Sequence, residues 1–191
     1  MNSYEFAEQA HAKLNQTRMD GSPFINHPKR VAEIVSTLPE IPKEIMDILI
    51  DVAHTHDTIE DTDATIEEIK TLFGEQVASI VWELTSPSSQ LPIEIQNAMP
   101  RKEKKQLMFD KLEIASDEAR LLKLCDRLDN LRDCTNSGRY SWVKKYYAES
   151  LDLVALLGSI KNKYLEANKH LLSNLNDELI RIQQWLVKQE K

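Results

Sequence analysis

Apolar residues recur every three or four positions along almost the whole chain, which is the spacing of one face of an α-helix. Between residues 28 and 38, for example, Val31, Ile34, Val35 and Leu38 share such a face. No segment shows the strict alternation of a half-buried strand, and we find no internal repeat. The pattern predicts helices over residues 4–16, 28–38, 42–56, 65–73, 75–84, 101–115, 117–133, 142–172 and 175–188. The predicted fold class is therefore all-α.

Several helix ends carry their own signals. Thr65 followed by Glu68 is a capping-box pattern, and Gly74 is suited to ending the short helix that follows it. Asn26 is a candidate N-cap ahead of Pro28, which occupies an early helical position that needs no N–H donor. The least regular segments are 86–100 and 135–141, which we predict to be loops.

The length of the chain fits one domain. A chain of 191 residues can bury a core of its own, and its 4 glycines and 7 prolines are too few for an all-β fold with frequent turns. We predict a single domain over residues 1–191, with a motif-bearing core over about 4–157 and closing helices to 188.

Charge and composition exclude several classes of function. The formal net charge of −7 argues against the broad basic surface that binds nucleic acid polymers, although a local pocket can still be positive. The chain has no apolar run of about 20 residues for a membrane span and no signal-peptide pattern at its start. Only two cysteines occur, without a CxxC pair, as is usual in a reducing compartment. We therefore expect a cytoplasmic protein.

The most informative segment is HDTIEDT at residues 56–62. Adjacent helical residues point about 100° apart, so His56 and Asp57 reach one metal ion only if it lies between their directions. Glu60 and Asp61 each follow four residues later, which brings them beside the first pair if the helix continues for another turn. The plain alternative is a surface hydrogen bond followed by a solvated acidic turn.

Two other segments add candidate ligands. His27 begins a helix in the segment FINHP, and Asp126, Asn130 and Asp133 form one polar stripe on a leucine-rich helix. Buried polar groups are costly unless they find partners. The stripe is therefore either part of a site or simply the solvent-exposed face of that helix.

Taken together, these segments resemble a known family. The motifs are RMDGSPFINHP at 18–28, HDTIEDT at 56–62, FG at 73–74 and KLCDRLDNLR at 123–132. They resemble those of HD-domain metal-dependent phosphohydrolases, which are helical bundles. More narrowly, they are similar to the hydrolase domain of the RelA/SpoT family and its stand-alone small alarmone hydrolases.

The resemblance implies a role for each matching residue. His27, His56, Asp57 and Asp126 would bind one divalent ion, which is Mn²⁺ in that family. Glu60 and Asp61 match its catalytic acidic pair, and Arg18 and Asn130 match residues that contact the nucleotide.

The resemblance also implies the reaction. A small-molecule nucleotide, (p)ppGpp, would lose its 3′-pyrophosphate to give GDP or GTP and pyrophosphate. Such a polyanion needs local positive charge in an acidic protein, and the ion, Arg18, Lys123 and Arg127 are the candidates to supply it. The alternative for Lys123 and Arg127 is that they are solvated charges on the outer face of their helix. Tyr146 and Tyr147 are candidates to stack on the base or to pack in the core.

Three positions depart from the family pattern. Met19 stands where many relatives have a basic residue, His54 is an extra histidine near the ligands, and Asp133 places a negative charge close to the expected phosphates. They leave open a second function, hydrolysis of another nucleotide or phosphate ester by the same kind of centre. A non-catalytic nucleotide-binding module is a third reading, and the apolar closing helices allow a homodimer without specifying one.

Overall fold

The computed structural model describes residues 1–189, and throughout this range the chain is helical apart from its connections. One isolated antiparallel bridge between Thr17 and Pro23 is the only extended pairing within that range. The α-helices are α1 (Ser3–Ala12), α2 (Asn26–Ser36), α3 (Lys43–Thr55), α4 (Thr58–Asp61), α5 (Ile66–Phe73), α6 (Glu75–Leu84), α7 (Ile93–Ala98), α8 (Arg101–Ile114), α9 (Asp117–Cys134), α10 (Tyr140–Ser159) and α11 (Leu165–Gln189). Two short 3₁₀ turns, η1 (Pro87–Gln90) and η2 (Thr135–Ser137), complete the order. The all-α prediction is confirmed.

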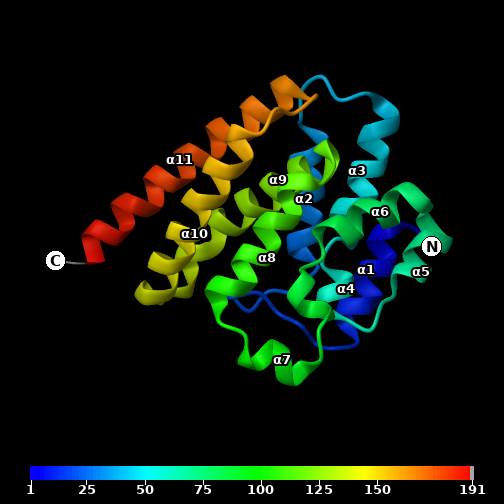
Figure 1. Ribbon diagram of the computed structural model, residues 1–191, viewed down its shortest axis with the longest axis horizontal. Coiled ribbons are helices and arrows are strands. Elements are labelled where there is room, and N and C mark those ends of the chain that lie inside the picture. The colour runs from blue at the N-terminus through cyan, green and yellow to red at the C-terminus, as the bar shows by residue number, and fades with distance from the viewer. Residues whose placement is uncertain (190–191) are drawn as a thin grey trace.

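Helix α9 lies at the centre of the bundle. It packs against α2, α3 and α6 on one side and against α10 and α11 on the other, as Figure 1 shows. The leucines that predicted this helix are buried, including Leu121, Leu124 and Leu128. Because α9 touches both halves of the molecule, any polar residue on it that faces α2 and α3 sits deep inside the fold.

Two predicted helix-end signals are confirmed, whereas the helix predicted over 4–16 already ends at Ala12. Thr65 and Glu68 form the reciprocal capping box, and Gly74 ends α5 with a φ of 93° that favours glycine. Asn26 is not the N-cap that we expected. Ile25 holds that position without a side-chain hydrogen bond, and Asn26 is the first residue of α2.

The predicted loops and the last two helices need correction. The segment 86–100 is not a plain loop, since it contains η1 and α7. The break between the closing helices lies at residues 160–164, not after 172. Asn162 explains this position: its side chain donates to the Asp117 carbonyl oxygen and accepts from the Tyr164 amide. These bonds dock the turn on the start of α9 and stop α10 there.

Within 1–189, none of the helices combines the length and the apolar character that a membrane crossing requires.

Candidate metal centre and substrate pockets

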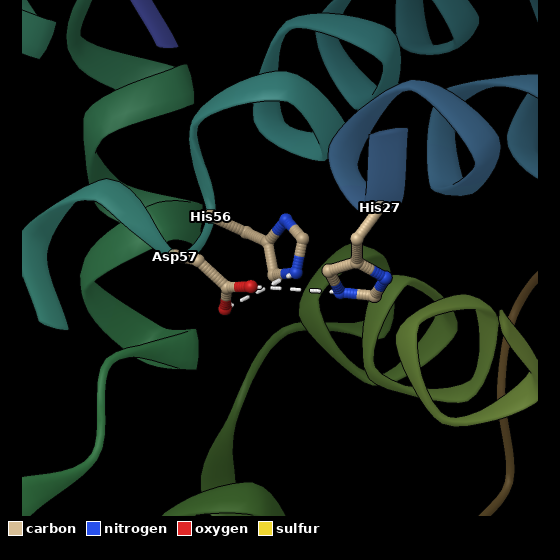
Figure 2. A group of neighbouring side chains, drawn as sticks. All are labelled: His27, His56 and Asp57. Carbon is tan, nitrogen blue, oxygen red and sulfur yellow. Dashed lines mark ion pairs between the residues drawn. The ribbon is translucent and has the colours of Figure 1, made fainter. Parts of the chain in front are cut away.

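The ends of α2, α3 and α4 and the middle of α9 bring four acidic and imidazole side chains together. His27 is the second residue of α2, His56 follows the last residue of α3, and Asp57 precedes α4. Asp126 comes from the middle of α9, which packs on both α2 and α3. Figure 2 shows Asp57 pointing at the rings of both histidines.

The distances are those of atoms that can share one ion. Asp57 Oδ1 lies 3.2 Å from His56 Nε2, and Asp57 Oδ2 lies 3.5 Å from His27 Nε2. One ligand atom from each of these residues falls within 4.8 Å of the others. Two donors bonded to one ion at about 2.1 Å each are roughly 3 Å apart, so the three residues fit a metal site.

Asp126 completes the group from the opposite side. Its Oδ1 lies 3.2 Å from His27 Nε2 and 4.0 Å from His56 Nε2. The same carboxylate accepts from Lys123 Nζ at 2.8 Å and from Asn130 Nδ2 at 2.5 Å. Asp126 is buried although it is charged, so its partners must replace the water that it has lost.

The hydrogen bonds of His56 leave one nitrogen for a ligand. Its Nδ1 bonds to the Ala53 carbonyl oxygen at 2.8 Å, which requires the proton on Nδ1. Its Nε2 is buried and has no hydrogen-bond partner among the described residues. A buried lone pair beside two carboxylates is the chemistry that a divalent cation requires. The residues present therefore fit a metal ion.

Asp129 is a member of the site that the sequence analysis missed. Its Oδ2 bonds to His27 Nδ1 at 2.7 Å. Arg30 donates to both of its oxygens, from Nε at 2.6 Å and from Nη2 at 3.0 Å. The signal in the sequence is an acidic residue on a leucine-rich helix, three positions after Asp126. This carboxylate fixes the orientation of the His27 ring, as second carboxylates do for metal-bound histidines.

The carboxylates around His27 favour a positive charge at its ring. Burial alone lowers the pKa of His27, but its bonds to Asp126 and Asp129 and the charge of Asp57 outweigh this and raise the pKa to about 9. Asp126 behaves in the opposite way: burial raises the pKa of its carboxyl, and the charges of Lys123 and His27 hold that pKa well below the usual value. A cation on His27 Nε2 supplies the charge that these groups favour.

Asp129→Asn tests the orienting role. We expect metal affinity to fall by about 10- to 100-fold, because an amide no longer anchors His27 Nδ1 and Arg30 as a carboxylate does. Dialysis against buffered free metal followed by elemental analysis measures this. Asp110→Asn, an exposed change on α8, is the control. Unaltered metal affinity in the Asp129 variant would show that His27 is oriented by its packing alone.

Glu60 and Asp61 lie on α4, a single turn of helix. The helix predicted over 42–56 ends at Thr55 and does not continue for the further turn that would place Glu60 and Asp61 four residues along the same helix from His56 and Asp57. The Thr58 hydroxyl donates to the Thr55 carbonyl oxygen, and the Glu60 and Asp61 amides both bond to the Asp57 carbonyl oxygen. The helix therefore breaks at His56 and Asp57, a new helix begins at Thr58, and Glu60 and Asp61 remain close to the two ligands.

Both side chains keep a solvent-exposed part, and the partial burial of their carboxyl groups shapes the ionisation of this pair. It raises the pKa of Glu60, with Lys123 opposing the shift, and Glu60 accepts from the Ser86 amide at 2.6 Å. Burial, together with the charges of Asp57 and Glu60, raises the pKa of Asp61 to about 7. A divalent cation nearby lowers both values again. The proton affinity of these two carboxyls therefore depends on whether a cation is bound beside them.

Arg18 and Asn130 are brought together, with Asp133 beside them. Arg18 Nη1 donates to Asn130 Oδ1 and Arg18 Nη2 to Asp133 Oδ2, each at 3.1 Å. Asn130 also donates to Asp126, so a continuous set of hydrogen bonds runs from Arg18 to the metal centre. The polar stripe on α9 is therefore not a solvent-exposed face, and Asp133 neutralises Arg18 instead of standing free.

A pocket of about 320 Å³ opens beside Arg18 and Asn130. Trp142 and Tyr146 form part of its wall, with their rings stacked 5.0 Å apart at an angle of 9°. Met19 lines it too, where a basic residue was expected from the resemblance. We call this the aromatic pocket. The sequence analysis did not single out Trp142, and its part in the pocket was missed.

The extra histidine is structural. His54 Nδ1 bonds to the Ser3 hydroxyl at 2.9 Å, and its ring meets the ring of Tyr4 edge-on. It does not join the three residues whose ligand atoms converge. His54 therefore ties α1 to α3.

Comparisons with known proteins agree with this geometry. The model of the HD domain family matches residues 3–160. The chain is 33% identical over 172 residues to guanosine-3′,5′-bis(diphosphate) 3′-pyrophosphohydrolase MESH1 of Homo sapiens, covering 87% of this chain and 89% of that protein. The corresponding protein of Danio rerio is 37% identical over 142 residues, 72% of each chain.

A solved structure shares the fold over nearly the whole chain. It is that of a metazoan ortholog of SpoT that hydrolyses ppGpp, with a TM-score of 0.72, 28% identity and coverage of 96% of this chain and 94% of that one. With helices, converging ligands and relatives in agreement, the chain belongs to the HD domain family, whose members depend on a divalent metal.

Proposed function

We propose that this protein is a metal-dependent hydrolase that removes the 3′-pyrophosphate of (p)ppGpp and releases GDP or GTP with pyrophosphate. The observation that carries the proposal is the convergence of four donor side chains beside two carboxyls, those of Glu60 and Asp61, whose pKa values are raised. The relatives named above, one of them 33% identical over 87% of this chain, support the choice of substrate.

His27, His56, Asp57 and Asp126 hold the ion in this proposal, and the resemblance favours Mn²⁺. Mixed imidazole and carboxylate ligands suit Mn²⁺, Fe²⁺ and Zn²⁺, so the identity of the metal rests on the family. A bound divalent ion supplies a more acidic water and neutralises charge on the phosphoryl oxygens.

The chain's own residues carry out the remaining steps. Glu60 and Asp61 orient the attacking water and accept its proton. The water oxygen bonds to the phosphorus next to the ribose, the bond from that phosphorus to the 3′ oxygen breaks, and the 3′ oxygen takes up a proton. Asn130, held by Arg18 and bonded to Asp126, lies between the metal centre and the aromatic pocket, where it can position the ribose.

The aromatic pocket accommodates the base in this proposal. The flat surface offered by Trp142 and Tyr146 suits a purine, and such stacking contributes about 1–3 kcal/mol per base. We expect Trp142→Leu to raise KM for ppGpp by about tenfold while metal content stays the same. Steady-state kinetics measures this, with Trp82→Leu, a half-exposed position on α6, as the control. An unaltered KM would place the base elsewhere.

One observation favours a second candidate, hydrolysis of another nucleotide. Asp133 occupies one nitrogen of Arg18, and Met19 offers no charge, so this side of the site has less positive charge than a polyphosphate ligand favours. A substrate panel with metal-loaded protein separates the two candidates. We expect ppGpp to be preferred over ordinary nucleoside mono-, di- and triphosphates. Activity on those nucleotides without activity on ppGpp would replace the first candidate by the second.

A further inference from the structure

A second cavity, of about 420 Å³, adjoins the metal centre between α8, α9 and α10. Its lining contains two carboxylates, Glu60 and Glu149, and five cationic side chains: Arg101, Lys104, Lys105, Lys123 and Arg127. We call it the cationic pocket. Five positive charges against two negative ones form an unusual surface in a chain of net charge −7.

Part of this positive charge is fixed by partners and part is free. Arg101 donates two hydrogen bonds to the Glu149 carboxylate, at 2.6 and 2.7 Å, and Lys105 donates one to Asp152 at 2.8 Å. Lys104, between them on α8, has no ion pair or hydrogen bond from its side chain among the described residues. The wall is therefore held in shape by ion pairs while one ammonium group remains available to a ligand.

Arg127 adds a second unsatisfied donor. Its guanidinium lies 4.4 Å from the centre of the Tyr146 ring and donates to the Ser150 hydroxyl at 3.0 Å. Its Nε is buried without a hydrogen-bond partner among residues 1–189. A buried N–H group without an acceptor costs free energy, and a ligand oxygen would relieve that cost.

The cationic pocket is continuous with the metal centre. Lys123 lines the pocket and bonds to Asp126 Oδ2, while Asp126 Oδ1 faces His27. Glu60 lines the same pocket from α4. Tyr146, which lines the aromatic pocket, packs its ring against the guanidinium of Arg127, which lines the cationic pocket. Both pockets thus adjoin the metal centre, the aromatic pocket through Asn130 and the cationic pocket through Lys123, each of which bonds to Asp126.

A ligand for this pocket must be small, strongly anionic and rich in oxygen acceptors. A diphosphate group fits, because its oxygens can bond to several cations at once. We propose that the cationic pocket is a pyrophosphate subsite, which holds the outer phosphate of the 3′-diphosphate before cleavage and the pyrophosphate product after it. This inference rests on the proposed function, and it assigns the leaving diphosphate to Lys104, Arg127 and Lys123.

Titration of inorganic pyrophosphate and of orthophosphate into metal-loaded protein, at one fixed free-metal concentration, tests the subsite by calorimetry. We expect pyrophosphate to bind at least tenfold more tightly than orthophosphate. Lys104→Ala should weaken pyrophosphate binding by about tenfold, because a charged hydrogen bond is lost. Lys104→Arg should retain it, and Lys102→Ala, an exposed change on the same helix, should leave it within about twofold.

The outcomes separate this inference from the proposed function. Equal affinity for the two anions, or wild-type pyrophosphate affinity in Lys104→Ala, overturns the subsite even if ppGpp is hydrolysed. Pyrophosphate affinity that depends on Lys104 in a protein unable to cleave ppGpp supports the subsite and removes the proposed function.

Discussion

Asp57→Ala is expected to abolish hydrolysis and to leave the protein with little bound metal. Asp57 approaches both histidine rings, at 3.2 Å from His56 Nε2 and 3.5 Å from His27 Nε2, and its contact with His56 is closer than that of Asp126, at 4.0 Å. Without it, His27 and His56 face each other with a single remaining carboxylate, Asp126. We expect activity below about 10⁻³ of wild type, since both the ion and the water that it activates are lost.

Two measurements on purified protein check this result: metal content by elemental analysis and pyrophosphate release from ppGpp. Asp47→Ala is the matched control, because Asp47 lies on α3, the helix that ends just before the ligands, is exposed and pairs with Lys43. A fully active Asp57→Ala protein with normal metal content would refute the ligand assignment.

Glu60→Gln is expected to separate metal binding from proton transfer. Glutamine keeps an oxygen that can accept from the Ser86 amide, so the local structure should persist. It cannot accept a proton, and turnover should fall by about 10²–10⁴-fold, the usual effect of losing a general acid or base. Metal content should stay at the wild-type level because none of the four candidate ligands is touched.

Turnover number and metal content are therefore measured together for this variant. Glu67→Gln, an exposed change on α5, is the control. Turnover that matches wild type in Glu60→Gln would transfer the proton-accepting role to Asp61, and the corresponding Asp61→Asn variant would then carry the loss.

Helix periodicity predicted the fold because each helix buries one apolar face. The capping box of Thr65 and Glu68 and the end at Gly74 are local signals, and both are confirmed. The break between the two closing helices, at residues 160–164, could not be predicted in this way. It depends on Asn162 reaching Asp117, which is 45 residues away in sequence. Long-range contacts of this kind leave no periodic trace.

The candidate site could be predicted only as far as its motifs reach. His27, His56, Asp57 and Asp126 stand in recognisable motifs, and the structure brings all four together. Asp129 lies inside the quoted motif at 123–132 but was given no role there, and Trp142 lies outside the quoted motifs. The role of Asp129 depends on the packing of α2 against α9, which places its carboxylate against His27 Nδ1. Trp142 became part of a pocket wall only through its stacking on Tyr146.

Release of pyrophosphate from ppGpp by the purified protein, with Mn²⁺ and then with EDTA, tests the central claim most directly. The account predicts that Mn²⁺ supports the formation of GDP and pyrophosphate in equal amounts and that EDTA stops it. A protein that holds one metal ion at His27, His56, Asp57 and Asp126 yet releases no pyrophosphate from ppGpp would contradict it.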